Sequence, residues 1–86
     1  MNILKISKIE KEAVIKLDSN ELVTLCNILY HKTKEENANE VIYRMYDMLM
    51  LARDLSQYGF IDSHCLDSIV NCRNKLNELK DKERFK

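Results

Sequence analysis

Apolar residues recur every three or four positions in three segments of the chain after residue 18, which is the spacing of amphipathic helices. Asp18 followed by Glu21 has the pattern of a capping box, and Asn37 followed by Glu40 repeats it. Gly59 stands where the second segment ends, because glycine accepts the left-handed conformation that often closes a helix. We predict helices near residues 19–35, 38–58 and 63–83.

The third predicted helix has the most regular apolar stripe. Steps of four, three, four and three residues separate its members, as in the seam along which one helix packs against another. This regularity favours packing on the core of the same domain over an intermolecular coiled coil. The members of the stripe are Cys65, Ile69, Cys72, Leu76 and Leu79.

The second predicted helix is apolar on nearly every side. Between residues 41 and 55, its polar members are Arg44, Asp47, Arg53 and Asp54. Because half of such a helix cannot face water without cost, two interpretations stay open. The helix is either the central one of the bundle, or it covers the core with one face and a partner with the other.

The first seventeen residues support two assignments. Apolar and polar residues alternate at Leu4 and Ile6, and again from Ala13 to Leu17, which predicts a hairpin that turns at residues 8–12. The same segment also aligns its apolar residues at helical spacing. The β-branched pair before the Asp18 cap favours strands, although no glycine marks the turn. Because a lone hairpin is marginally stable in water, we expect it to pack on the helices.

Composition agrees with a mostly helical protein. The chain has 86 residues, no proline and one glycine, which are fewer turn-forming residues than a sheet-rich fold normally has. We predict a single α+β domain over residues 1–86, mostly α, in which a hairpin at 1–17 packs on three helices at 18–84. No stretch has the apolar length of a signal peptide or a membrane span, so we expect a cytoplasmic protein.

The charge balance argues against a dedicated nucleic-acid binder. Fourteen basic and fourteen acidic residues give a net charge of zero, whereas phosphate binding normally requires a basic excess. The first half of the third predicted helix, residues 62–67, is also acidic and apolar, unlike a recognition helix. Basic residues that keep this function open as an alternative are Lys5, Lys8, Lys11 and Lys16, with Arg73, Lys75 and Lys80.

Candidate catalytic and metal-binding residues have unfavourable spacing. Cys65 and Cys72 are two helical turns apart, and His64 points about 100° away from Cys65 on a helix. Cys26 and His31 fall on different helix faces, and one glycine cannot build a phosphate-binding loop. We therefore expect no enzymatic activity, no metal and no cofactor.

Two segments, VIKLDSNELVTLCNILY and MYDMLMLARDLSQYGFID, resemble small accessory proteins of prophages and mobile elements from AT-rich Gram-positive bacteria. The resemblance is one of pattern and includes anti-CRISPR proteins, which share no motif. It implies a protein that binds host machinery and assigns no residue a role.

These observations lead us to expect a stoichiometric protein-binding inhibitor or modulator of host machinery, such as an anti-CRISPR protein acting on a CRISPR effector nuclease. The alternatives are a small nucleic-acid-binding regulator and a self-associating structural protein, a homodimer joined by the extra apolar face of the second helix. On that helix we expect aromatic and methionine side chains to form the exposed face that interfaces favour. The candidate partner-binding residues are Tyr43, Tyr46, Asp47 and Met50 of this helix, with Lys8 and Lys11 of the hairpin tip.

Overall fold

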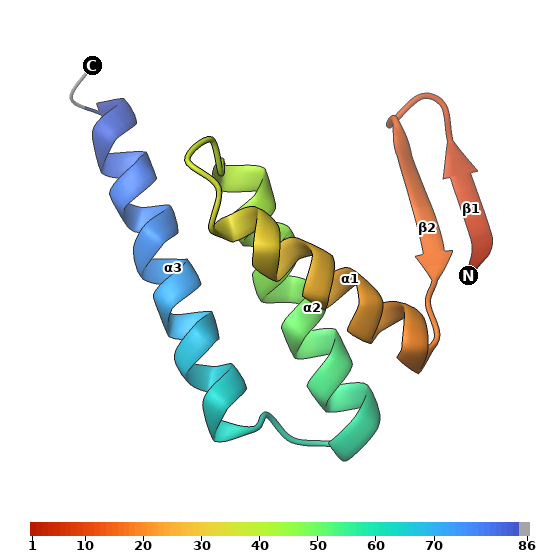
Figure 1. Cartoon of the computed structure of the whole chain (residues 1–86). Coiled ribbons are helices and arrows are strands. Elements are labelled where there is room, and N and C mark those ends of the chain that lie inside the picture. Colours follow the sequence, from red (N-terminus) through yellow and green to blue (C-terminus); the bar gives the residue numbers. More distant parts are fainter. Residues whose placement is uncertain (85–86) are drawn as a thin grey trace.

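The computed structural model describes the fold of residues 1–84 as a β-hairpin followed by three helices (Figure 1). The predicted mostly helical α+β fold is confirmed, and residues 1–17 form the hairpin and not a helix. Residues 85–86 of the predicted domain lie outside the described part. No helix of residues 1–84 has the length and apolar character needed to cross a membrane. The elements are β1 (Asn2–Ser7), β2 (Glu12–Lys16), α1 (Ser19–Thr33), α2 (Glu40–Tyr58) and α3 (Ser63–Arg84).

Helix α2 is the central helix. It packs against α1 on one side and against α3 on the other (Figure 1). This middle position agrees with the first of the two interpretations, but Met45, Met48 and Leu55 stay exposed, so α2 also has the uncovered face that the second interpretation requires. The predicted core-facing stripe of α3 is also confirmed, because its first three members are buried against α2. The core cluster consists of Cys26 from α1, Met50 from α2, and Cys65, Ile69 and Cys72 from α3.

The helix ends follow local hydrogen-bonding chemistry. The Asp18 carboxylate accepts the Glu21 N–H at 2.8 Å, and the Glu21 carboxylate accepts the Asp18 N–H at 3.1 Å, so the capping box is confirmed. Gly59 ends α2 with φ of 75°. The predicted Asn37 cap is wrong, because Asn39 caps α2 by accepting the Ile42 N–H at 3.1 Å. Residues 34–37 form a turn that carries the chain past the earlier asparagine.

The hairpin turns without glycine. Lys11 takes the left-handed conformation instead, with φ of 58°. The strands are antiparallel, and a β-bulge lies between Ile3 and Lys5. Because Ile3 pairs with Ile15 and Ile6 pairs with Ala13, the bulge places these four apolar side chains on one face of the hairpin.

The expected packing of the hairpin on the helices is wrong. Neither strand packs against α1, α2 or the described part of α3, and Figure 1 shows the hairpin standing beside the helices. The contact that joins it to them is an ion pair of 2.6 Å between the Met1 ammonium and Glu21. Only residues 17–18 connect β2 to α1, and the extended backbone of Asp18 leads directly into the capping box. The hairpin and α1 are therefore joined by a short link, with no apolar contact between them in the described residues.

Candidate protein-binding surfaces

The inner face of α2 holds two of the predicted partner-binding residues. Met50 is 1% exposed and lies in the core cluster, and Asp47 is 5% exposed. The expectation that Met50 belongs to an exposed face is therefore wrong. The physical reason is that α2 has neighbours on two sides, and the face that we expected to be free is turned towards them.

Two buried carboxylates on this face join α2 to its neighbours. Asp54, 1% exposed, accepts the Asp62 N–H at 3.1 Å and the Arg53 guanidinium at 3.1 Å. Burial opposes its charge, but the hydrogen bonds from Asp62, the Cys65 thiol and Arg53 hold the pKa of Asp54 below its ordinary value. This carboxylate therefore fixes the link between α2 and α3.

Asp47 is less completely paired than Asp54. One of its carboxylate oxygens accepts the Arg73 Nε–H of α3 at 3.3 Å, and the other is buried without a hydrogen-bond partner. The Arg73 side chain is mostly exposed, so this ion pair lies at the edge of the helix interface. We expected Asp47 on a partner-binding face and gave Asp54 no role, and the burial of both carboxylates was not predicted. The available signal was their seven-residue spacing, which places them on one face of an otherwise apolar helix.

Tyr43 and Tyr46 are half-buried and stabilise the join between α1 and α2. The Tyr43 hydroxyl donates to the Thr33 carbonyl at 3.2 Å, and the rings of Tyr46 and Tyr30 lie 6.3 Å apart. Burial raises the pKa of Tyr46. Both tyrosines line a cleft of about 210 Å³ where the three helices meet, together with Lys34 and other side chains. Their placement makes them supports of the fold and not a freely exposed face.

The outer face of α2 carries a different set of apolar side chains. They repeat at steps of four, three, four and three residues, and each is exposed to solvent. Part of this face forms a shallow groove bounded by Arg44 and Leu49. We call these residues the outer stripe: Val41, Met45, Met48, Ala52 and Leu55. The spacing of the outer stripe was visible in the sequence. We assigned the partner-binding face to the opposite side of the helix because that side contains Tyr43 and Tyr46.

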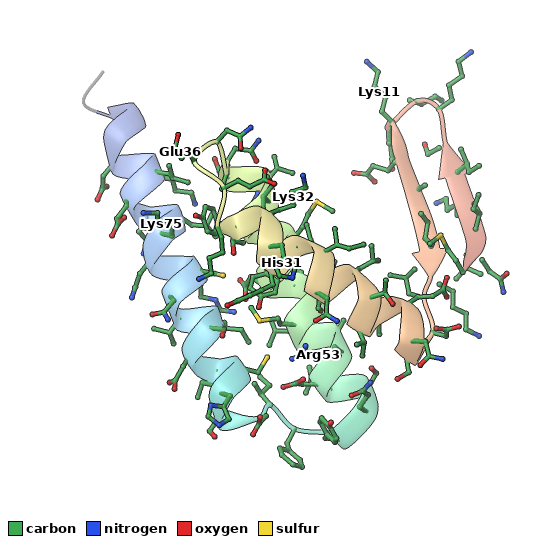
Figure 2. The ribbon with its side chains drawn as sticks, in the orientation of Figure 1. Lys11, His31, Lys32, Glu36, Arg53 and Lys75 are labelled. Atoms are coloured by element: carbon green, nitrogen blue, oxygen red, sulfur yellow. The ribbon has the colours of Figure 1, made fainter. Side chains whose placement is uncertain are left out.

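The hairpin presents a second uncovered apolar surface. We call Ile3, Ile6, Ala13 and Ile15 the hairpin face. Ile6 is 70% exposed, and no described helix covers the hairpin face. The predicted residues Lys8 and Lys11 lie in the exposed turn at the far end of the hairpin, and Figure 2 shows Lys11 pointing away from the helices.

The three cysteines meet in one cluster, which their sequence spacing did not reveal. All three are free and buried, and burial raises the pKa of each thiol, that of Cys65 to about 11. Arg53 lies 3.6 Å from the Cys65 sulfur. Within residues 1–84, no three His, Cys, Asp or Glu side chains are close enough together to hold a metal ion. The protonated thiols act as small apolar core groups.

Comparison of the chain with protein-family models, curated proteins and solved structures finds no match.

Proposed function

We propose that this chain is a stoichiometric protein-binding protein that engages its target through the hairpin. The observation that carries the proposal is the uncovered hairpin face, which no described helix covers. An isolated two-stranded hairpin is only marginally stable in water, whereas an apolar partner surface would cover its exposed side. The hairpin therefore has the properties of a recognition element.

The charge around the hairpin face defines the target further. Four lysines and two glutamates lie in residues 1–17, so the segment is net basic. The turn holds Lys8 and Lys11 together with Glu10 and with Ile9, an apolar side chain that is 95% exposed. A complementary target has an apolar patch with acidic groups at its border, because charge complementarity accelerates and orients association.

The resemblance to accessory proteins of prophages suggests the class of target. We propose that the protein inhibits or modulates host machinery by covering a working surface, as an anti-CRISPR protein covers a CRISPR effector nuclease. This part of the proposal rests on the sequence resemblance, and the hairpin supplies a surface through which such a protein can bind.

The distribution of basic residues counts against direct nucleic-acid binding. Arg73 is paired with Asp47, and Lys75 is paired with Glu78. Figure 2 places Lys11 and Lys75 on opposite sides of the molecule. The basic side chains of the hairpin and of α3 therefore do not combine into one groove or stripe that follows a phosphate backbone.

The proposal is tested by affinity capture from a lysate of CRISPR-bearing Gram-positive cells, with and without nuclease. The tagged wild-type chain is compared with Ile6→Glu on the hairpin face and with Val14→Glu as a matched control. Val14 lies on the opposite face of the same hairpin and is also exposed. Both variants place a charged, poor strand former in a strand, so they differ only in the face that they alter.

We expect one protein to be captured by the wild type and by Val14→Glu, at a constant ratio and regardless of nuclease. Ile6→Glu should lose it while keeping the same helical circular dichroism. Equal capture by Ile6→Glu would contradict the proposed surface. Capture that disappears with nuclease would contradict direct protein binding and support nucleic-acid binding instead. Recovery of the tagged chain alone would contradict the proposal that the lysate contains a protein target.

A further inference from the structure

The outer stripe of α2 has the spacing of a coiled-coil seam. Its steps of four, three, four and three residues keep all five side chains on one line along the helix. The larger members are about half-exposed, and no residue of the described chain covers them. Helices α1 and α3 occupy other faces of α2, and the hairpin stands apart from it. A solvent-exposed seam on the central helix of a small protein is complementary to another helix.

We propose that the outer stripe is the interface of a two-fold symmetric dimer, in which α2 packs antiparallel against α2 of a second copy. In an antiparallel pair, each a-type position of one helix packs beside a d-type position of the other. One register that uses four of the five stripe residues places Met45 beside Met48 of the second copy and Val41 beside Ala52, and it is the register that we propose. The two-fold axis then passes between Met45 and Met48, and the same patch serves both copies.

The charges at the stripe allow two identical surfaces to approach. No stripe residue is charged, and the neighbouring Arg44 is paired with Glu40 of its own helix at 3.8 Å. The chain as a whole has a net charge of zero, so no long-range repulsion separates two copies. The stripe itself offers no charged side chain that would select a partner of opposite charge.

The size of the face agrees with a weak, specific dimer. From Val41 to Leu55 the helix rises about 21 Å, close to four turns. Half-buried Ile42, Leu49 and Leu51 extend the apolar surface on its flanks. A face of this length belongs with the small interfaces of weak, transient complexes, which bury less than about 1,200 Å² in total. We expect a dissociation constant in the micromolar range or weaker.

Sedimentation equilibrium between low micromolar and several hundred micromolar protein tests the proposal. The wild type should shift from the 10.2 kDa monomer to twice that mass. Met45→Glu with Met48→Glu should remain monomeric throughout. The matched control is Leu66→Glu with Val70→Glu on α3, since Val70 and Met45 are both 47% exposed. The control should dimerise like the wild type.

Covalent trapping gives a second test that does not depend on the stability of charged variants. Val41→Cys with Ala52→Cys should form a disulfide-linked dimer on mild oxidation, because the proposed register brings these positions together. Val70→Cys should not, and the native cysteines do not compete because they are buried. A wild type that stays monomeric, a dimer that survives the two charged stripe substitutions, or larger open assemblies would each overturn the proposal. The hairpin variant Ile6→Glu should still dimerise, so this test is independent of target binding.

Discussion

In a small domain a helix usually buries apolar residues and exposes charged ones, whereas α2 buries two carboxylates on one face and exposes apolar side chains on the other. On the inner face, Asp47 and Asp54 are buried against α3 and the link that leads to it. On the outer face, Met45 and Met48 are exposed. Burying a charged group costs free energy, and apolar surface left in water contributes nothing to folding. The residue types on each face of α2 therefore need a separate explanation. Hydrogen bonds within the chain explain Asp54 and only one oxygen of Asp47, whereas we explain the outer stripe by a surface outside the chain.

The comparison also shows why composition alone misjudges such a helix. A helix that is apolar on nearly all sides has two apolar faces, and its polar residues do not mark the solvent side. In α2, Asp47 and Asp54 mark the join to α3, whereas Arg44 lies beside the outer stripe. In this helix the regular apolar stripe is the face left outside.

The largest expected effect is a difference in stability loss between alanine substitutions at two methionines of α2 that lie two residues apart. Met50 is 1% exposed and Met48 is 57% exposed. Met50→Ala should lower the free energy of unfolding by about 2–5 kcal/mol, because it removes core contacts and leaves a cavity. Met48→Ala should change the stability of the monomer by no more than about 0.5 kcal/mol. Urea unfolding at low protein concentration measures both, and equal losses would contradict the assignment of inner and outer faces.

A smaller effect is expected at the best-paired carboxylate of the inner face. Asp54→Asn keeps the volume but loses the charged acceptor of the hydrogen bonds from Asp62, Cys65 and Arg53, so we expect a loss of about 2 kcal/mol at neutral pH. Because the folded pKa of Asp54 is lowered, its contribution is present above the unfolded value, about 3.9, and is lost as the pH falls further. Denaturant titrations from pH 7 to pH 2 should show the wild type and Asp54→Asn converging in stability at acid pH. A constant difference would rule out this role of the charge.

The smallest effect has the opposite sign. Among the described residues, Asp47 has one buried oxygen without a partner, and its other oxygen pairs with the mostly exposed Arg73. Asp47→Leu should therefore raise the free energy of unfolding by about 1 kcal/mol, since an apolar side chain removes the desolvation cost. Thermal and urea unfolding test this increase. A loss of stability would mean that the ion pair to α3 outweighs the buried, unpaired oxygen.

Sequence patterns predicted the elements well because local chemistry determines them. The Asp18 capping box, the Gly59 end of α2 and the core stripe of α3 each depend on residues within a turn or two of one another. Asn37 and Asn39 are both suitable N-cap residues two positions apart, so the sequence pattern did not show which of them caps α2. The position of the hairpin was not predicted, because the alternation that identifies its strands does not say whether their apolar face meets a helix.

The candidate surface was harder to predict because it depends on which face of α2 meets α1 and α3. Tyr43, Tyr46 and Met50 are typical interface residues, but side-chain type cannot distinguish a protein core from a protein interface. The four-three spacing of the outer stripe was present in the sequence, as it was in α3. Without the positions of both neighbours, either apolar face of the helix could be assigned to the core.

Methionine oxidation by dilute hydrogen peroxide, followed by mass spectrometry at several protein concentrations, tests the central claim most directly. Met1 is 65% exposed and serves as the internal reference. The account predicts that Met45 and Met48 oxidise almost as fast as Met1 in dilute protein and become protected as concentration rises, while Met50 stays protected throughout. Protection of Met48 equal to that of Met50 at every dilution would contradict an exposed outer face. Oxidation of Met48 that does not depend on concentration would contradict its burial in a dimer.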